Sequence, residues 1–231
     1  MTPTTMGSAD KKSYKNDGNA AVLRRVPATV GTVLDVGCGA GDNARILKAA
    51  GKVVDGITLS ASERDEASKF CRGVVIHNLE QGLPAGLSGS YDLVLCSHVL
   101  EHICWPNKLL HDIRDRLVPG GLLVVALPNM LFYKNRWKLL AGRFEYEESG
   151  LMDNTHFRWY TFASAQRLLA SSGFEVVTAE AEGSFPIPFR RSLFSRALTR
   201  PVDAWASSAF PGLFGYQMVF TARPQQESTG I

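Results

Sequence analysis

The sequence predicts a single α/β domain in which a mostly parallel β-sheet lies between two layers of helices. Short apolar segments alternate with segments of helical periodicity along the chain, and residues 91–97 are apolar on both faces, as in a central parallel strand. Residues 33–41 pass from an apolar run through closely spaced glycines into a helical pattern, as expected where a buried strand turns into a helix. A chain of 231 residues, 45% of them hydrophobic, can bury one sizeable core.

The predicted elements follow from apolar periodicity and from the residues that end it. Helices are expected from 20 to 26, where Pro27 stops the first, and then at 44–50, 60–70, 106–117 and 163–171. The helix at 60–70 carries Glu63, Arg64, Asp65 and Glu66, which predicts a solvated charged face, and His111 of the next helix is expected near solvent. Strands are expected at 33–36, 52–59, 74–78, 91–97, 122–127, 174–179 and 215–222, the last one antiparallel.

Domain limits follow from composition. Residues 1–19 are polar and lysine-rich and are expected to form a flexible tail, residues 20–223 a single domain, and residues 224–231 a frayed end. Two insertions, at about 130–160 after the fifth strand and 183–214 after the sixth, are expected to form a helical cap.

Charge and cysteine usage exclude several classes of function. A formal net charge of +3 is too small and dispersed for a nucleic-acid surface. The polar N-terminus has no signal-peptide core, and no apolar run reaches the length of a membrane span, so a cytoplasmic location is expected. The cysteines lack C-x-x-C spacing and are expected to be reduced thiols outside any disulfide framework or zinc site; they are Cys38, Cys71, Cys96 and Cys104.

The glycine-rich segment V-L-D-V-G-C-G-A-G-D at 33–42 is the strongest candidate for a ligand site. Gly37 and Gly39 allow backbone N–H groups to approach a bound molecule closely. The spacing G-x-G-x-G differs from the G-x-G-x-x-G of dinucleotide sites, and Asp35 would repel a pyrophosphate but attract a cation. S-adenosylmethionine (SAM) carries a sulfonium and an α-ammonium group. The alternative is an ordinary glycine-rich bend.

This segment resembles motif I of the Rossmann-like, class I SAM-dependent methyltransferases, usually written V-L-D-V-G-C-G-x-G. The resemblance implies a three-layer sandwich with a seven-stranded, mostly parallel sheet, SAM as the cofactor, and methyl transfer as the activity. It also implies that Asp35, Gly37, Cys38 and Gly39 bind the cofactor.

The same resemblance assigns further cofactor contacts at the ends of later strands. An acidic residue usually accepts hydrogen bonds from the ribose at the end of the second strand, but here Thr58 stands in its place, followed by Leu59. We therefore expect ribose binding to be weaker or shared with a nearby group, and Thr58→Asp to keep or tighten it. Asn78 and Leu79 are placed beside the adenine, and Ser97 at the end of the fourth strand.

The segment His98-Val99-Leu100-Glu101-His102 also fits the zinc motif H-x-x-E-H. Such a site needs both histidines on a stable helix with a free face and a third ligand. Because this segment directly follows a buried strand and adjoins the next helix start at Trp105-Pro106, we expect no metal there. Residues 99–103 instead match the methyltransferase pattern V-L-E-H-[LIV].

The first insertion contains a basic, aromatic helix and the run G-L-M-D-N-T-H-F-R at 150–158. The G-x-x-D-x-T-H-x-R block resembles one group of bacterial methyltransferases that is often linked to sugar or surface-polysaccharide modification. Overall the resemblance covers about 34–220.

From this block we predict the groups that handle the acceptor. A histidine suits proton removal at neutral pH, so His156 is the first candidate for the general base and His102 the second, the alternative being a structural histidine. In similar methyltransferases an aromatic residue ahead of the first helix folds over the cofactor, so Tyr14 is either such a residue or part of a loose tail. The predicted substrate-binding residues are Tyr14, Asn129, Tyr133 and Arg158, the last suited to an acidic or phosphorylated acceptor.

The expected activity is SAM-dependent methyl transfer to a small or sugar-like acceptor, most readily at a hydroxyl oxygen. Three alternatives stay open: N-methylation, a non-catalytic SAM-binding partner subunit, and a lipid-directed or membrane-associated methyltransferase. The last is suggested by residues 186–200, where Arg190, Arg191 and Arg200 oppose apolar side chains, as on a helix lying on a membrane surface. A lid or packing helix is the other explanation of that stretch.

Overall fold

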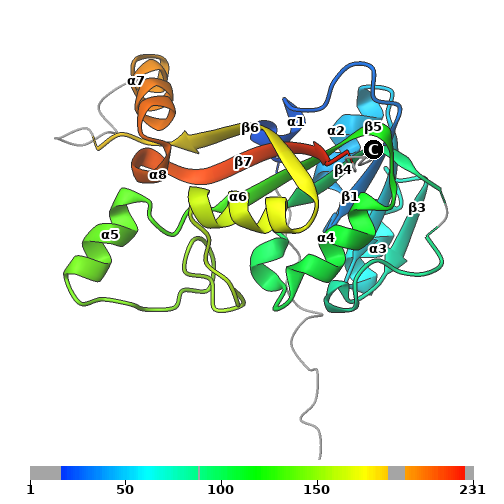
Figure 1. Ribbon diagram of the computed structural model, residues 1–231, viewed down its shortest axis with the longest axis horizontal. Coiled ribbons are helices and arrows are strands. Elements are labelled where there is room, and N and C mark those ends of the chain that lie inside the picture. The colour runs from blue at the N-terminus through cyan, green and yellow to red at the C-terminus, as the bar shows by residue number, and fades with distance from the viewer. Residues whose placement is uncertain (1–16, 88, 187–195, 227–231) are drawn as a thin grey trace, which may run out of the picture.

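The computed structural model describes residues 17–87, 89–186 and 196–226. Its seven strands form one sheet in the order β3-β2-β1-β4-β5-β7-β6, with helices on both faces (Figure 1). The strands are β1 (Thr32–Val36), β2 (Val53–Thr58), β3 (Gly73–Ile76), β4 (Tyr91–Ser97), β5 (Leu117–Pro128), β6 (Phe174–Gly183) and β7 (Gly215–Pro224). Strand β7 runs antiparallel to both of its neighbours, whereas the other pairs are parallel. The predicted fold class is confirmed.

The helices are α1 (Ala20–Leu23), α2 (Asp42–Ala49), α3 (Ala61–Ala67), α4 (Pro106–Arg114), α5 (Tyr133–Leu140), α6 (Phe162–Ser171), α7 (Arg196–Ala209) and α8 (Pro211–Phe214), with short 3-10 turns η2 (Leu79–Gln81) and η3 (Leu100–His102). Helices α1, α3 and α4 are shorter than the sequence pattern suggests, whereas α2 and α6 lie close to their predicted ranges. Helix α4 ends at Arg114 because β5 already begins at Leu117, five residues before the predicted start of that strand. Thr161 caps α6, since its side chain accepts from the Ser164 backbone N–H.

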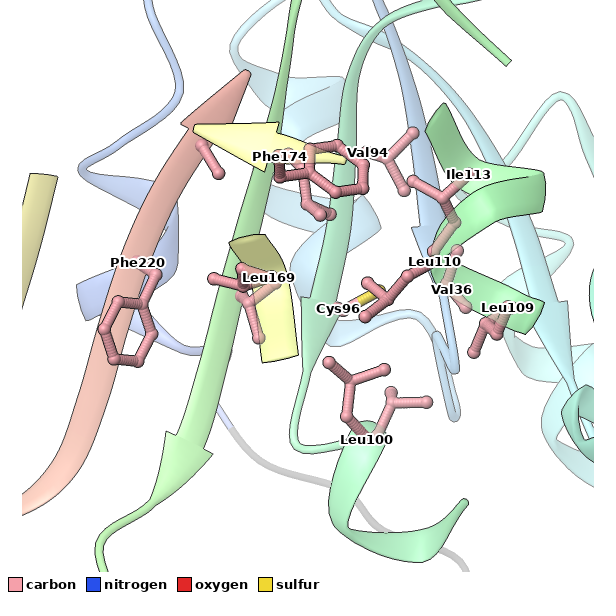
Figure 2. Close-up of a cluster of buried hydrophobic side chains, with 14 of the residues drawn as sticks. Val36, Val94, Cys96, Leu100, Leu109, Leu110, Ile113, Leu169, Phe174 and Phe220 are labelled. Atoms are coloured by element: carbon pink, nitrogen blue, oxygen red, sulfur yellow. The ribbon is translucent and has the colours of Figure 1, made fainter. Parts of the chain in front are cut away.

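Two apolar layers hold the sheet between the helices. On one face, α4 and α6 bring Leu110, Ile113 and Leu169 against β4 and β5, with Phe174 of β6 among them (Figure 2). On the other face, α1 and α2 cover β1 and β4 with a smaller cluster that includes Val22 and Leu47. Burying such side chains contributes about 1.5–3 kcal/mol each, which fixes the strands whose ends carry the site.

The insertions are only partly helical. After β5, the chain forms α5 and then continues without a regular helix to α6, turning at Gly142 and Gly150, both in the left-handed region with φ of 70° and 91°. The second insertion supplies α7, with Pro201 in its interior, and α8. Helices α5, α7 and α8 gather at one end of the molecule (Figure 1). Residues 187–195, with Arg190 and Arg191, lie outside the described part of the chain.

Candidate active site

The glycine-rich loop lies where β1 ends, beside the end of β2. Gly37, Gly39 and Gly41 have φ values of 73°, 52° and 86°, which L-residues with side chains rarely adopt. A Cβ atom on Gly37 would come within 2.5 Å of Val99 Cγ2. The Cys38 N–H donates to the Ile57 carbonyl at 2.8 Å, which ties the loop to β2. The loop is therefore packed against the turn after β4, and the turn that the sequence predicted is present.

Asp35, inside β1, carries a deeply buried carboxyl group. It is 1% exposed, and neither side-chain oxygen has a hydrogen-bond partner among the described residues. Burial raises the pKa of Asp35 to about 7, an effect that the Asn43 side chain partly offsets. A cationic ligand at the adjoining loop would stabilise the charged form, so the electrostatics fit the ligand that the sequence suggested.

At the end of β2, Thr58 is joined by a carboxylate that sequence reasoning placed in solvent. The Thr58 hydroxyl donates to Glu63 Oε2 at 2.7 Å, and both side chains are buried. The expectation that Glu63 lies on a solvated face is wrong, because the first turn of α3 packs over the end of β2. Glu63 brings a carboxylate from the helix to the end of β2, where Thr58 stands in the usual acidic position. The five-residue spacing of Glu63 from Thr58 was the available signal.

The residues expected near the cofactor at the ends of β2 and β3 differ in exposure and in hydrogen bonding. The Asn78 side chain accepts from the Glu80 N–H at 3.0 Å and caps η2, so its carbonyl oxygen already has a donor. Leu79 is partly buried against the main apolar cluster, while Leu59 is 52% exposed.

A polar network that the sequence did not indicate closes the end of β4. His98 is the only residue other than glycine with positive φ in the described part of the chain, at 57°. Its Nδ1 lies 3.1 Å from Glu101 Oε1 and its Nε2 lies 2.6 Å from Gln217 Oε1. Asn19 Nδ2 donates to both Ser97 Oγ and Gln217 Oε1 at 3.0 Å. Desolvation lowers the pKa of His98, but the hydrogen bond and charge of Glu101 outweigh it and raise the pKa.

Glu101, His102 and His156 meet beside this network, although His156 comes from the first insertion. The two imidazole rings contact each other edge to face, with centroids 4.7 Å apart. His102 Nδ1 lies 3.1 Å from both the carbonyl oxygen and the hydroxyl of Thr155. The backbone N–H groups of Phe157 and Arg158 donate to the Glu101 carbonyl at 2.9 and 3.1 Å. The structure thus brings the two predicted base candidates together.

His156 is held in an unusual environment for a histidine. It is 8% exposed, and its Nδ1 is buried without a hydrogen-bond partner among the described residues. Burial lowers the pKa of His156, although the negative charge of Glu101 opposes this. Asp153 accepts from the N–H and hydroxyl of Thr155, at 2.9 and 2.7 Å, and so fixes the loop that carries the histidine.

Other predicted acceptor residues lie apart from the histidine pair or are already engaged. Asn129 is fully buried, and its Nδ2 donates to the Gly215 carbonyl at 2.7 Å, which joins β5 to the chain after α8. Tyr133, at the start of α5, packs against Phe132 with ring centroids 4.6 Å apart. These two residues support the cap, and Tyr14 lies outside the described residues.

Arg158 lines a pocket that neither histidine lines. Its Nε donates to the Cys104 carbonyl at 2.6 Å and its guanidinium stacks over the Trp105 ring at 5.5 Å. With residues of α6, including Arg167, it lines a pocket of about 440 Å³ that contains neither histidine.

Comparison with known proteins assigns the family. Residues 12–179 match a family described as a methyltransferase domain. The chain belongs to this family. Over 128 residues the methyltransferase is 30% identical to a ubiquinone biosynthesis O-methyltransferase of Caulobacter sp. strain K31, an alignment that covers 50% of this chain and 46% of that protein. The chain thus spans about half the length of the curated relatives that it matches.

Solved structures support the same fold. A SAM-dependent methyltransferase from Archaeoglobus fulgidus superimposes with a TM-score of 0.60 at 21% identity, covering 84% of this chain and 86% of that one. A magnesium protoporphyrin IX methyltransferase from Synechocystis, solved with bound S-adenosylhomocysteine, gives a TM-score of 0.52 at 18% identity and covers 84% and 74%. SAM is the cofactor of this methyltransferase, and the buried Asp35 carboxylate beside the loop fits its cationic groups.

Two further expectations can be compared with the structure. The cysteines Cys38, Cys71, Cys96 and Cys104 are free thiols, and burial raises the pKa of each, including that of Cys71 to about 12. Among the described residues, no helix is both long and apolar enough to cross a membrane.

Proposed function

We propose that this methyltransferase transfers the methyl group of SAM to a hydroxyl oxygen of a small or sugar-like acceptor. The observation that carries the proposal is the cluster of Glu101, His102 and His156, which adjoins the turn packed on the glycine-rich loop. Relatives named ubiquinone biosynthesis O-methyltransferase are consistent with oxygen as the methylated atom.

The reaction needs little from the protein beyond alignment and proton removal. The sulfonium already activates the methyl carbon, so an in-line approach of the hydroxyl oxygen and loss of its proton complete the transfer. His156 is the proposed proton acceptor, because its buried Nδ1 has no hydrogen-bond partner among the described residues and can receive the hydroxyl proton. His102 is the second candidate: its Nδ1 donates to the Thr155 carbonyl, which leaves the Nε2 lone pair available.

The cofactor would be held by residues at three strand ends. We assign the backbone of Gly37, Cys38 and Gly39 to the methionine part of SAM and Asp35 to its positive charge. The ribose is assigned to the Thr58–Glu63 pair, in which the carboxylate offers the acceptors that a lone hydroxyl lacks. We assign Leu59, Asn78 and Leu79 to the adenine side of SAM. Ser97, the last residue of β4, is assigned to the same cofactor site.

Replacing His156 tests the proposal. His156→Ala should leave SAM affinity unchanged and lower the rate of S-adenosylhomocysteine formation by about 10²- to 10⁴-fold, as is typical when a general base is removed. His111→Ala is the matched control, because His111 lies exposed on α4, away from the cluster. The assay is run with a panel of sugar, phosphosugar and phenolic hydroxyl acceptors.

Two results would contradict this assignment. Near-normal turnover in His156→Ala together with loss in His102→Ala would move the base to the turn after β4. Tight SAM binding without S-adenosylhomocysteine formation across a broad acceptor panel would instead support a non-catalytic SAM-binding subunit.

A second candidate, a lipid-linked acceptor met at a membrane surface, is favoured by one feature of the cap. Large apolar side chains on α5 and α7 face solvent: Trp137 is 69% exposed, Leu140 79% and Trp205 62%. Lysines lie on α5 beside them, including Lys138. Such an arrangement suits the headgroup region of an anionic bilayer. Co-sedimentation with anionic vesicles, lost in a Trp137→Ser, Leu140→Ser variant, is the expected result.

A further inference from the structure

We propose that Glu101, His102 and His156 form a binding site for a divalent transition-metal ion. A carboxylate oxygen and two imidazole nitrogens, one from each residue, all lie within 4.8 Å of one another. Two histidines and one carboxylate are a donor set that binds zinc and non-haem iron in proteins.

Two of these side chains carry buried polar atoms that the protein leaves without partners. Glu101 is 0% exposed and its Oε2 makes no hydrogen bond, and His156 is 8% exposed with an unpartnered Nδ1, among the residues that the structure describes. An unsatisfied buried polar atom destabilises the folded protein, and more so when it is charged. A cation bound between the three side chains would compensate both atoms at once.

The surrounding contacts orient the ligands as in a metal centre. The Thr155 carbonyl can only accept, so His102 carries its proton on Nδ1 and presents Nε2 as a lone pair. Glu101 Oε1 receives the hydrogen bond from His98 at 3.1 Å, which leaves Oε2 as the free oxygen. The loop that carries His156 is fixed by Asp153, which accepts from the N–H and the hydroxyl of Thr155. Contacts around the site thus position each of the three residues.

The spacing allows coordination after small side-chain movements. Three atoms no more than 4.8 Å apart have a common point within about 2.8 Å of each, whereas bonds to zinc from nitrogen or oxygen are about 2.0–2.1 Å. Each ligand atom would need to move by about 0.7 Å or less. The backbone need not move, because the Phe157 and Arg158 N–H groups already hold the insertion onto Glu101.

The donor types decide which ions fit. Magnesium and calcium favour sites built from oxygen atoms, whereas two imidazoles favour Zn²⁺, Fe²⁺ or Co²⁺. Three protein ligands leave a coordination position for water or for an acceptor hydroxyl, whose pKa a bound ion would lower. Without a bound ion, His156 would accept the proton of the acceptor hydroxyl. With an ion bound, the ion would activate that hydroxyl.

This proposal revises the expectation drawn from H-x-x-E-H. That expectation concerned His98, Glu101 and His102 as one set, and the structure directs His98 to Gln217 and Glu101 instead. The third ligand comes from His156, far away in the sequence, and tertiary packing alone brings it to the turn after β4.

Metal titration tests the site directly. Full-length protein without a histidine tag is stripped with a chelator and titrated with Co²⁺, whose visible absorbance reports coordination, and bound Co²⁺ is then displaced by Zn²⁺. One equivalent is expected per chain. His156→Ala and Glu101→Gln should each weaken binding by at least about 10-fold, by comparison with losses seen even for residues that only support ligands. His111→Ala should bind as the wild type does.

The controls keep the outcome unambiguous. Glu101→Gln preserves the size of the buried side chain, and SAM binding verifies that each variant is folded. No stoichiometric binding to the stripped wild type, or equal affinity in the wild type, His156→Ala and Glu101→Gln, would overturn the proposal. Because the titration uses no acceptor and no turnover, its failure would leave the proposed methyl transfer intact.

Discussion

Replacing Asp35 with asparagine should make the cofactor-free protein more stable at pH 8 while weakening SAM binding. The Asp35 carboxyl group is buried inside β1 without a hydrogen-bond partner among the described residues, and burial raises its pKa from 3.8 to about 7. A carboxylate in this position lowers the free energy of unfolding of the cofactor-free protein and strengthens the binding of the cationic ligand. The asparagine side chain has nearly the same shape as that of aspartate and carries no charge.

The size and sign of the effect follow from linkage. A shift from 3.8 to about 7 is about 3 pKa units, which at 1.36 kcal/mol per unit gives about 4 kcal/mol. Between those two values the folded protein binds one proton more than the unfolded chain, so the free energy of unfolding falls as pH rises. Above about pH 7 the penalty is complete. Asp35→Asn should therefore gain up to about 4 kcal/mol at pH 8 and little at pH 4.

Urea unfolding without SAM at pH 4, 6 and 8 measures the first effect, and titration calorimetry with SAM the second. Losing a charge-assisted contact of about 1.5–3 kcal/mol should weaken SAM binding by about 10- to 150-fold. Asp65→Asn, a surface carboxylate paired with Arg64, is the control. A wild type and an Asp35→Asn variant with parallel stability-versus-pH curves and equal SAM affinity would refute the reasoning.

The remaining predictions also concern the cofactor. Gly39→Val should abolish SAM binding in calorimetry while circular dichroism stays native, because φ is 52° there and the loop backbone must approach the ligand; wild-type affinity would make the loop merely structural. Thr58→Asp, which the sequence alone favoured, should instead weaken SAM binding, since the new carboxylate would face Glu63. Glu63→Gln should weaken SAM binding by about 10-fold or more through loss of a charge-assisted acceptor, and tighter binding in either variant would exclude the pair from the ribose contact.

The sequence by itself determined the fold class and the glycine-rich turn after β1, because both are encoded locally. Apolar runs of strand length, helical periodicity and the glycines at 37, 39 and 41 each act within a few residues, so the parallel strands and the turn after β1 were predictable. We predicted an adenine contact for Asn78, and the structure shows that its side chain caps η2; an asparagine ahead of a short helical turn is a local signal for such a cap.

Only the tertiary structure decided which side chains meet. A charged helix face is solvated unless another element covers it, and the packing of α3 on β2 buries Glu63 against Thr58. Likewise His98 is nearer in sequence to Glu101 and His102 than His156 is, yet its positive φ and its bond to Gln217 turn it toward β7. His156 takes the place at the cluster because two N–H groups of the insertion dock on the Glu101 carbonyl, a contact between distant segments that no local pattern specifies.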